Sequence, residues 1–261
     1  MKFIPRQLHE AADNSRGGKE GWRSRFKGIL SAVLVLGAVY IALGFLADWS
    51  VHFVSEETEA AWFSWTDEVL LQAAQPPSAA VQGIFDKLIL DSGLRPYPYR
   101  LVMMPERIPN AFALPGGTIM VTSGLLDLVE TEIGRAMVLG HELGHLQYRH
   151  GLKGLGRSLL LAGALSMAGF DSSSLLRQTP LLAEMRHSRV QEAESDTFGL
   201  NLVYAKYGTT EGALEFFEDI SLLEGGNPAG LTHSMQSWLQ THPLTEVRLA
   251  HLRSQASALE N

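Results

Sequence analysis

The longest apolar segment of the chain is residues 28–47, which contain no charged side chain. A helix rises about 1.5 Å per residue, so one of this length crosses the roughly 30 Å hydrocarbon core of a bilayer. A buried helix of a soluble protein would normally carry a polar face, and this segment has none. A cleaved signal peptide is the alternative, but its apolar part would be shorter and nearer the N-terminus. The pattern therefore predicts an uncleaved transmembrane helix, and Trp49 after it suits a bilayer interface.

Basic residues gather on one side of this segment. Residues 1–27 hold seven lysines and arginines, whereas the first such residue after position 47 is Lys87. The positive-inside rule then places residues 1–27 in the cytoplasm, as a flexible basic tail, and the rest of the chain on the other side. Residues 48–77 are predicted to be a juxtamembrane linker that ends at Pro76-Pro77. Its aromatic residues could lie along the membrane surface or pack on the following domain.

From residue 78 onward the chain alternates between helical and strand patterns. Apolar residues at helical spacing predict a helix over 78–90, which Ser78 can cap. Short apolar segments predict three strands, over residues 99–104, 110–114 and 118–122. Further helices are predicted over residues 132–148, 182–204, 210–223 and 243–258. The apolar segment 158–170 is too short to span a bilayer and is predicted to be a buried or interfacial helix. The expected fold class is α+β, with residues 78–261 as one mostly helical domain.

Composition narrows the possible functions. The 261 residues suffice for one domain of roughly 150–200 residues and an appendage. The formal net charge of −7 disfavours nucleic-acid binding. The absence of cysteine excludes disulfides, thiolate metal ligands and a cysteine nucleophile. No Gly-x-Ser-x-Gly element occurs, which disfavours a serine hydrolase of that type.

Two histidines and a glutamate stand close together in the predicted helix 132–148. Residues i and i+4 of a helix lie on one face, so His141 and His145 can present both imidazoles to one metal ion. Glu142 follows the first histidine, where it can deprotonate a water molecule beside the metal without being a ligand. This His-Glu-x-x-His pattern is typical of zinc peptidases, although isolated matches also arise by chance.

A catalytic zinc site needs a third protein ligand. Glu192 and Asp196 are spaced i and i+4 in the predicted helix 182–204, so both can face the same site. One carboxylate can bind the metal while the other accepts the N–H of a ligand histidine. Taken alone, such a pair is more commonly a solvated helix face, and the spacing does not decide which carboxylate would be the ligand.

Several segments together resemble the membrane-associated gluzincin metallopeptidases, the family of the CAAX prenyl endopeptidase, the heat-shock protease HtpX and the mitochondrial inner-membrane stress protease. The matching segments are residues 110–126, His141-Glu-Leu-Gly-His145, residues 188–196, and Thr241-His-Pro with Arg248. They cover most of residues 99–252. Ser195 stands where the family often has alanine, and this chain has only one evident membrane span. The resemblance implies a zincin-like metallopeptidase domain behind one N-terminal transmembrane helix.

The resemblance also implies a role for each matching side chain. His141, His145 and Glu192 would bind one Zn²⁺ ion per chain, and Glu142 would be the general base.

Three further residues would support this centre. Asp196 would orient a ligand histidine, and Arg248 would pair with a nearby acid. His242 would approach the metal and steady the oxyanion or the water.

The predicted strand 110–114 would bind an extended substrate through backbone hydrogen bonds, so sequence selectivity should be loose. The expected substrate-binding residues are Asn110, Ala111, Phe112 and Ala113. The remaining histidines fit no comparable pattern and are interpreted as surface or core residues: His9, His52, His150, His187, His233 and His251. If one of them belongs to the site, it is His187, next to the third-ligand segment.

The expected function is that of a membrane-anchored zinc endopeptidase acting on unfolded or misassembled membrane or envelope proteins, a quality-control role by analogy with the family. Residues 28–47 would lie in the bilayer of an inner membrane. The domain would face the periplasm in a bacterium, and the mitochondrial inner membrane is the parallel location in a eukaryote. Two alternatives remain: a chaperone or assembly factor that binds extended segments without cleaving them, and a zinc hydrolase of small molecules. The sequence does not predict an oligomeric state.

Overall fold

The computed structural model describes residues 22–167, 187–226, 238–239 and 241–261. Within them the chain is mostly helical and has one small sheet, which confirms the predicted α+β class. Three predictions lie partly outside these residues: the basic tail, the end of the apolar segment 158–170 and the start of the helix 182–204. The chain divides into two compact units, Met1–Phe45 and Leu46–Asn261.

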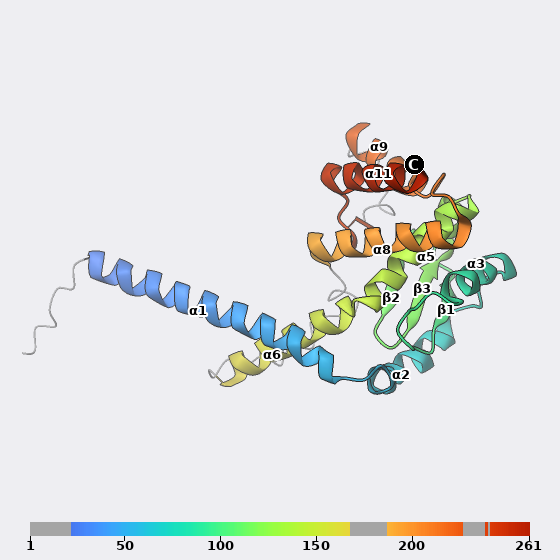
Figure 1. Ribbon diagram of the computed structural model, residues 1–261. Coiled ribbons are helices and arrows are strands. Elements are labelled where there is room, and N and C mark those ends of the chain that lie inside the picture. The colour runs from blue at the N-terminus through green and yellow to red at the C-terminus, as the bar shows by residue number, and fades with distance from the viewer. Residues whose placement is uncertain (1–21, 168–186, 227–237, 240) are drawn as a thin grey trace, which may run out of the picture. The chain divides into compact units, whose positions relative to one another are not determined.

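Figure 1 shows the order of the elements along the chain. The strands are β1 (Arg100–Met104), β2 (Ala111–Leu114) and β3 (Thr118–Thr122). The helices are α1 (Trp22–Ser50), the short 3₁₀ helix η2 (Val51–Phe53), α2 (Glu56–Ala73), α3 (Ala79–Ile89), α4 (Ser123–Leu128), α5 (Glu132–Gln147), α6 (His150–Met167), α8 (Arg189–Tyr207), α9 (Glu215–Gly226) and α11 (Glu246–Glu260).

Capping residues move some helix ends away from the predicted positions. α8 begins at Arg189 because the Ser188 hydroxyl accepts a hydrogen bond from the Gln191 backbone N–H at 3.3 Å. α11 begins at Glu246, later than the predicted start at residue 243, because the Thr245 hydroxyl caps its first turn. α9 begins after a turn at residues 211–214, and α6 begins earlier than predicted.

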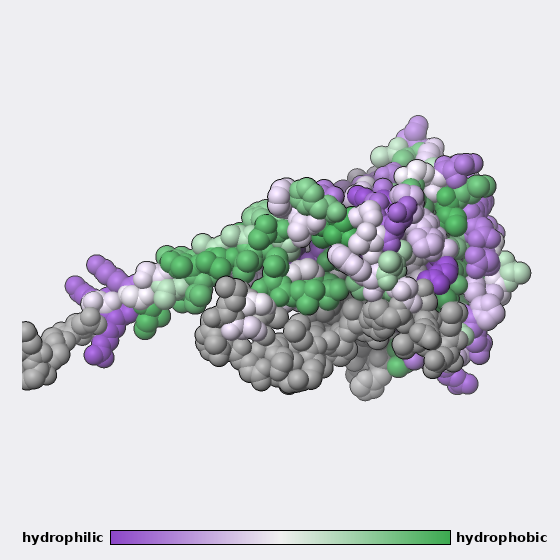
Figure 2. Space-filling view, turned by 90° about the horizontal axis from the view of Figure 1, so that it is seen from below, coloured by the Kyte–Doolittle hydropathy of each residue, from purple (hydrophilic) through white to green (hydrophobic). Residues whose placement is uncertain are grey.

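The N-terminal helix α1 is longer than the predicted apolar segment at both ends. Apolar side chains such as Leu34 and Phe45 are exposed along it. Figure 2 shows this apolar surface in green and the hydrophilic side chains at its N-terminal end in purple. Among the described residues, Trp22–Phe53 is the one helical segment long and apolar enough to cross a membrane.

The sheet has three strands in the order β1-β3-β2. β1 pairs in parallel with β3, with Arg100 opposite Thr118, and β2 pairs antiparallel with β3, with Ala111 opposite Val121. Every residue of the central strand β3 is buried. β2 therefore lies at one edge of the sheet, where backbone groups on its outer side are not used by β3.

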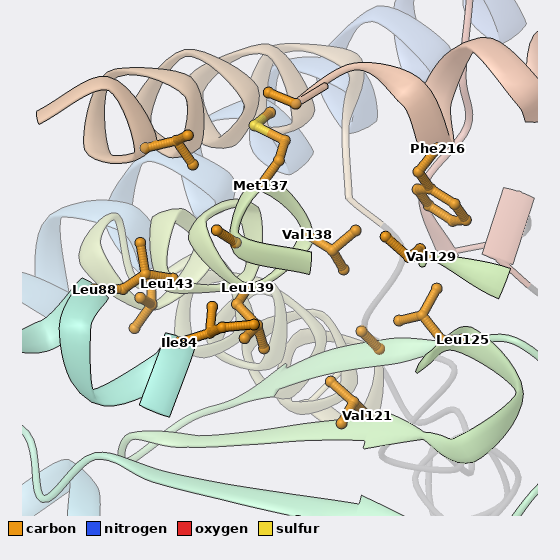
Figure 3. Packing of buried hydrophobic residues seen from close by; sticks show 14 of the residues in the cluster. Ile84, Leu88, Val121, Leu125, Val129, Met137, Val138, Leu139, Leu143 and Phe216 are labelled. Atoms are coloured by element: carbon orange, nitrogen blue, oxygen red, sulfur yellow. The ribbon is translucent and has the colours of Figure 1, made fainter. Parts of the chain in front are cut away.

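The hydrophobic core is built around α5 and includes side chains from the sheet and from helices α3, α8, α9 and α11. Figure 3 shows Leu143 of α5 beside Leu88 of α3 and Leu139 of α5 beside Ile84 of α3, with Val121 on strand β3 below them. Leu139 and Leu143 are spaced i and i+4, so they lie on one face of the helix. α5 is buried from Ala136 to Leu146, which makes it the central helix of the second unit.

Residues 48–77, predicted as a linker, carry η2 and α2 and fall within the second compact unit. Glu59 of α2 is 1% exposed and is held by three donors. Its carboxylate accepts hydrogen bonds from the Tyr97 hydroxyl at 2.7 Å, the Gly116 backbone N–H at 3.1 Å and Arg149 Nε at 2.8 Å. Arg149 follows α5 with a left-handed φ of 57°, which ends that helix. The segment before residue 78 thus fastens the end of α5 to the β2–β3 turn.

Replacing Glu59 with alanine is expected to lower the free energy of unfolding by about 3–5 kcal/mol, because the buried Arg149 guanidinium would lose its counter-charge. The matched control is Asp48→Ala, which removes an ion pair with Arg157 at the surface and should cost less than about 1 kcal/mol. Urea unfolding of the full chain in detergent, followed by tryptophan fluorescence, measures both losses. Losses of equal size would contradict this account of Glu59.

Candidate active site

The site is built on two helices, α5 and α8, that lie side by side (Figure 1). The Thr131 hydroxyl caps α5 by accepting a hydrogen bond from the Gly134 backbone N–H at 3.1 Å. His141, Glu142 and His145 follow in the fully buried part of α5. α8 contributes Glu192 in its first turn, immediately after its capping box.

Small residues allow these two helices to approach closely. A Cβ atom at Gly199 of α8 would lie 2.7 Å from the backbone nitrogen of His141. A Cβ at Gly144 of α5 would lie 2.8 Å from Cα of Ser195, and one at Gly140 would lie 3.1 Å from Cα of Gly199. Contacts below 3.0 Å are essentially never made by real Cβ atoms. Because these glycines have no Cβ, the two helices lie close enough for Glu192 and Asp196 of α8 to reach the histidines of α5.

Three donor groups converge between the helices. The Nε2 atoms of His141 and His145 lie 3.0 Å apart. Glu192 Oε2 is 3.6 Å from His141 Nε2, and Glu192 Oε1 is 3.4 Å from His145 Nε2. His242 lies beside these three groups. One ligand atom from each of the four residues lies within 4.8 Å of all the others, and all four residues are buried.

Asp196 determines which nitrogen of His141 faces this cluster. Its Oδ1 lies 2.9 Å from His141 Nδ1, and because an ionised carboxylate can only accept, Nδ1 carries the proton. In the tautomer with that proton on Nδ1, the lone pair lies on Nε2, the atom that faces His145 and Glu192. Arg248 holds the Asp196 carboxylate through two hydrogen bonds of 2.8 Å, from Nε and from Nη2. Burial disfavours the charge of Asp196, but His141 and Arg248 outweigh it and lower its pKa.

The donor set fits a divalent metal ion. Arg248 Nη1 lies 2.8 Å from Glu192 Oε2 and offsets part of its charge. The lone pairs of the two imidazoles still converge on this buried site, and a cation among them would be stabilised. Ligands bound about 2.0–2.1 Å from a tetrahedral zinc ion lie about 3.3 Å from each other. The donor atoms of His141, His145 and Glu192 are 3.0–3.6 Å apart. Two imidazoles and a carboxylate are also a ligand set of catalytic zinc sites, which keep a further position for water.

Glu142 extends into the same buried site. Neither of its carboxylate oxygens has a hydrogen-bond partner among the described residues. Burial raises the pKa of Glu142, and the facing imidazole of His242 partly offsets this rise. A carboxylate with a raised pKa and free lone pairs is suited to accept a proton at neutral pH.

His242 faces both glutamates. Its Nδ1 lies 3.2 Å from Glu192 Oε1, and its Nε2 lies 3.5 Å from Glu142 Oε1. The Trp238 ring stacks on the imidazole with centroids 4.3 Å apart. Burial opposes the charged form of His242, but Glu192 and Glu142 outweigh it and raise the pKa of the imidazole.

Comparison with known sequences decides the family. A model of peptidase family M48 matches residues 76–256, which is most of the chain. The chain belongs to peptidase family M48. The predicted resemblance to membrane-associated gluzincin metallopeptidases is therefore confirmed, and with it the class of enzyme, a metalloprotease.

Curated relatives of this M48 peptidase come from mitochondria and from bacteria. The mitochondrial metalloendopeptidase OMA1 of Schizosaccharomyces pombe is 27% identical over 245 residues, which are 86% of this chain and 70% of the relative. The metalloprotease YcaL of Escherichia coli is 31% identical over 172 residues, 62% of this chain and 63% of the relative. The metalloprotease LoiP of Escherichia coli is also 31% identical over 172 residues, 63% of this chain and 64% of the relative.

The M48 domain brings together the side chains that the sequence proposed from three separate segments. His141, Glu142, His145, Glu192 and His242 lie in the buried cluster. Asp196 and Arg248 form the layer behind it.

The predicted substrate strand of the M48 domain is the edge strand β2. The Asn110 carbonyl accepts a hydrogen bond from the Thr122 backbone N–H at 3.0 Å, so Ala111 and Ala113 direct their backbone groups to the outer edge. The backbone N–H of Ala111 is taken up by the Asn110 side chain at 3.0 Å. Phe112 pairs with Met120 of β3 on the inner side.

Two histidines of the M48 domain that were interpreted as surface or core residues touch His145. Nδ1 of His150 lies 3.0 Å from Nδ1 of His145. The His187 ring stacks on His145 with centroids 3.7 Å apart, and burial lowers the pKa of His187 to about 3. The position of His187 next to the third-ligand segment was a signal for this contact. The sequence contained no such signal for His150, because this residue follows His145 by five positions and lies on a different helix, α6.

Proposed function

We propose that the chain is a zinc-dependent endopeptidase in which His141, His145 and Glu192 bind the metal and Glu142 is the general base. The observation that carries the proposal is the convergence of three donor groups within 3.0–3.6 Å beside the buried carboxylate of Glu142, which makes no hydrogen bond among the described residues. Zinc, when bound, would polarise the scissile carbonyl and lower the pKa of a water molecule to about 7.

The residues around the metal then have separate tasks. A carboxylate oxygen of Glu142 accepts a proton from the attacking water and later donates it to the nitrogen of the leaving amine. His242, whose raised pKa favours its charged form, offers an N–H to the oxyanion that develops on the scissile carbonyl. Asp196 and Arg248 keep the Nε2 lone pair of His141 directed at the metal.

The proposed substrate is an extended polypeptide added to the outer edge of β2. Ala111 and Ala113 would supply backbone hydrogen bonds, while Asn110 would release the Ala111 N–H that it now holds. Binding through backbone groups places few demands on side chains, so selectivity would be loose. This suits unfolded or misassembled membrane or envelope proteins, which expose such segments, and a role in protein quality control.

Removal of the metal tests this function directly. The full chain in detergent, treated with 1,10-phenanthroline and then freed of the chelator, should no longer cleave labelled casein. About one equivalent of Zn²⁺ per chain should restore cleavage, whereas Mg²⁺ should not, because Mg²⁺ prefers oxygen ligands. Full casein cleavage by chains shown to contain no metal would overturn the proposal.

We further propose that residues 28–47 span an inner membrane, with residues 1–27 in the cytoplasm and the catalytic unit on the other side. The basic residues before the apolar segment support this orientation. The parallel location in a eukaryote is the mitochondrial inner membrane.

Because the chain contains no cysteine, single-cysteine labelling can test the orientation without a background. Arg23 and Glu130 are both exposed and lie on opposite sides of the apolar segment. In Escherichia coli cells with a permeabilised outer membrane, Glu130→Cys should react with a membrane-impermeant maleimide, and Arg23→Cys should react only after lysis. The reverse pattern would refute the proposed orientation.

A further inference from the structure

A second imidazole stands behind His145. His150, the first residue of α6, is 1% exposed and places Nδ1 at 3.0 Å from His145 Nδ1. Its other nitrogen, Nε2, lies 3.1 Å from Glu194 Oε2, on α8. Glu194 is two residues beyond Glu192, and its side chain is 49% exposed. Three side chains thus form one chain of contacts from the protein surface to a proposed metal ligand.

If both imidazoles are neutral, only one assignment of donors and acceptors is possible for the contacts between Glu194, His150 and His145. The Glu194 carboxylate can only accept, so His150 Nε2 donates to it. A neutral imidazole has one N–H, so His150 Nδ1 is then an acceptor. His145 Nδ1 must donate to it, which leaves the lone pair of His145 on Nε2. That atom is the one that faces His141 and Glu192.

We propose that His150, held by Glu194, is a positioning residue that fixes the metal-binding tautomer of His145. The inference rests on the proposed function, because it assumes that His145 binds zinc. His150 would do for His145 what Asp196 does for His141, with one imidazole inserted between ligand and carboxylate. The difference has a geometric cause: Asp196 is buried beside its histidine, whereas Glu194 lies at the surface and needs a ring to bridge the distance.

The neighbours of His150 support this assignment over two others. The Ser195 hydroxyl lies 3.5 Å from His150 Nδ1, the limit of a hydrogen bond, so His145 is the better-placed partner. His145, His150 and His187 could together suggest a second metal site. His187, however, stacks on His145 with an interplanar angle of 22°. Imidazole lone pairs lie in the ring plane, so stacked rings direct theirs side by side and do not converge on one ion.

The experiment measures Zn²⁺ affinity of the metal-free full chain in detergent, by competition with a chromophoric chelator. His150→Leu removes the acceptor and should weaken the affinity by about 10–100-fold. His150→Asn keeps an acceptor near the position of Nδ1 and should stay within about 3-fold of the wild type, because one hydrogen bond is then retained. Glu194→Ala should fall between them. His251→Gln alters an exposed histidine and should change nothing.

A cobalt-substituted chain provides a signature that simple loss of packing would not produce. His150→Leu should weaken the visible absorption of tetrahedral Co²⁺, and His150→Asn should restore it. Wild-type affinity in His150→Leu overturns the proposal, as does a stoichiometry of two Zn²⁺ ions per wild-type chain with one lost in that variant. If His150→Leu does not fold, Glu194→Ala provides the test, since the Glu194 side chain is half exposed. Unchanged Zn²⁺ affinity in Glu194→Ala would also overturn the proposal. A wild-type chain that binds no Zn²⁺ would instead defeat the proposed function.

Discussion

Glu142→Gln is expected to reduce casein cleavage by roughly 10²–10⁴-fold, the range that a positioned general base contributes. Glutamine has nearly the same shape but cannot accept a proton from water. The carboxylate of Glu142 has no hydrogen-bond partner among the described residues, so its replacement breaks no bond that holds the fold. Loss of a buried charge whose pKa is already raised by burial should leave stability unchanged or increase it.

The measurement compares the turnover number for labelled casein with Zn²⁺ content. Zn²⁺ content should remain at the wild-type value in Glu142→Gln, because Glu142 is not among the proposed ligands. Glu130→Gln is the matched control, since Glu130 is exposed and lies outside the site. Full activity in Glu142→Gln would remove the general base from the mechanism. Complete inactivity together with retained substrate binding would also separate an endopeptidase from a chaperone that needs no base.

Glu192→Ala and Asp196→Asn are expected to affect the metal to different degrees. Glu192→Ala removes a proposed ligand and should abolish stoichiometric Zn²⁺ binding, because the two histidines alone leave the ion without its third protein donor. Asp196→Asn should weaken affinity by about 10–100-fold. Arg248 donates to both Asp196 oxygens, so the amide oxygen is drawn to Arg248 and the amide NH₂ faces His141 Nδ1, which favours the wrong tautomer.

Stability of the metal-free chain separates the same two variants. Asp196→Asn leaves Arg248 without the carboxylate that receives two of its hydrogen bonds, which should cost about 3 kcal/mol of unfolding free energy. Glu192→Ala removes one acceptor of Arg248, whose Nη1 lies 2.8 Å from Glu192 Oε2. It should cost less, because Arg248 keeps its two hydrogen bonds to Asp196. Chelator competition and urea unfolding of both variants give the two quantities. If Glu192→Ala binds one Zn²⁺ per chain and Asp196→Asn binds none, Asp196 is the metal ligand and Glu192 is not.

Local features of the site could be predicted from the sequence because they depend on spacing within one helix. His141 and His145 share a face of α5 whatever surrounds it, and Glu142 must follow the first of them. The same holds for the cap at Thr131 and for the short apolar strands. The apolar residues 28–47 likewise predict a long helix by themselves.

Contacts between helices were decided only by tertiary structure. The spacing of Glu192 and Asp196 allowed either to be the ligand, and the structure directs Glu192 to the Nε2 atoms and Asp196 to Nδ1 of His141. That outcome depends on the separation of α5 and α8, which glycines at the contact allow to be unusually small.

The same reason explains the contacts for which the sequence contained no signal. Glu59 meets Arg149 across 90 positions of the chain, and His150 reaches His145 because α6 restarts directly after the left-handed residue that ends α5. The sequence by itself determined that two imidazoles and a base share one helix. Which side chains complete and orient them was decided by packing between elements, because distances between elements depend on the whole fold and not on local spacing.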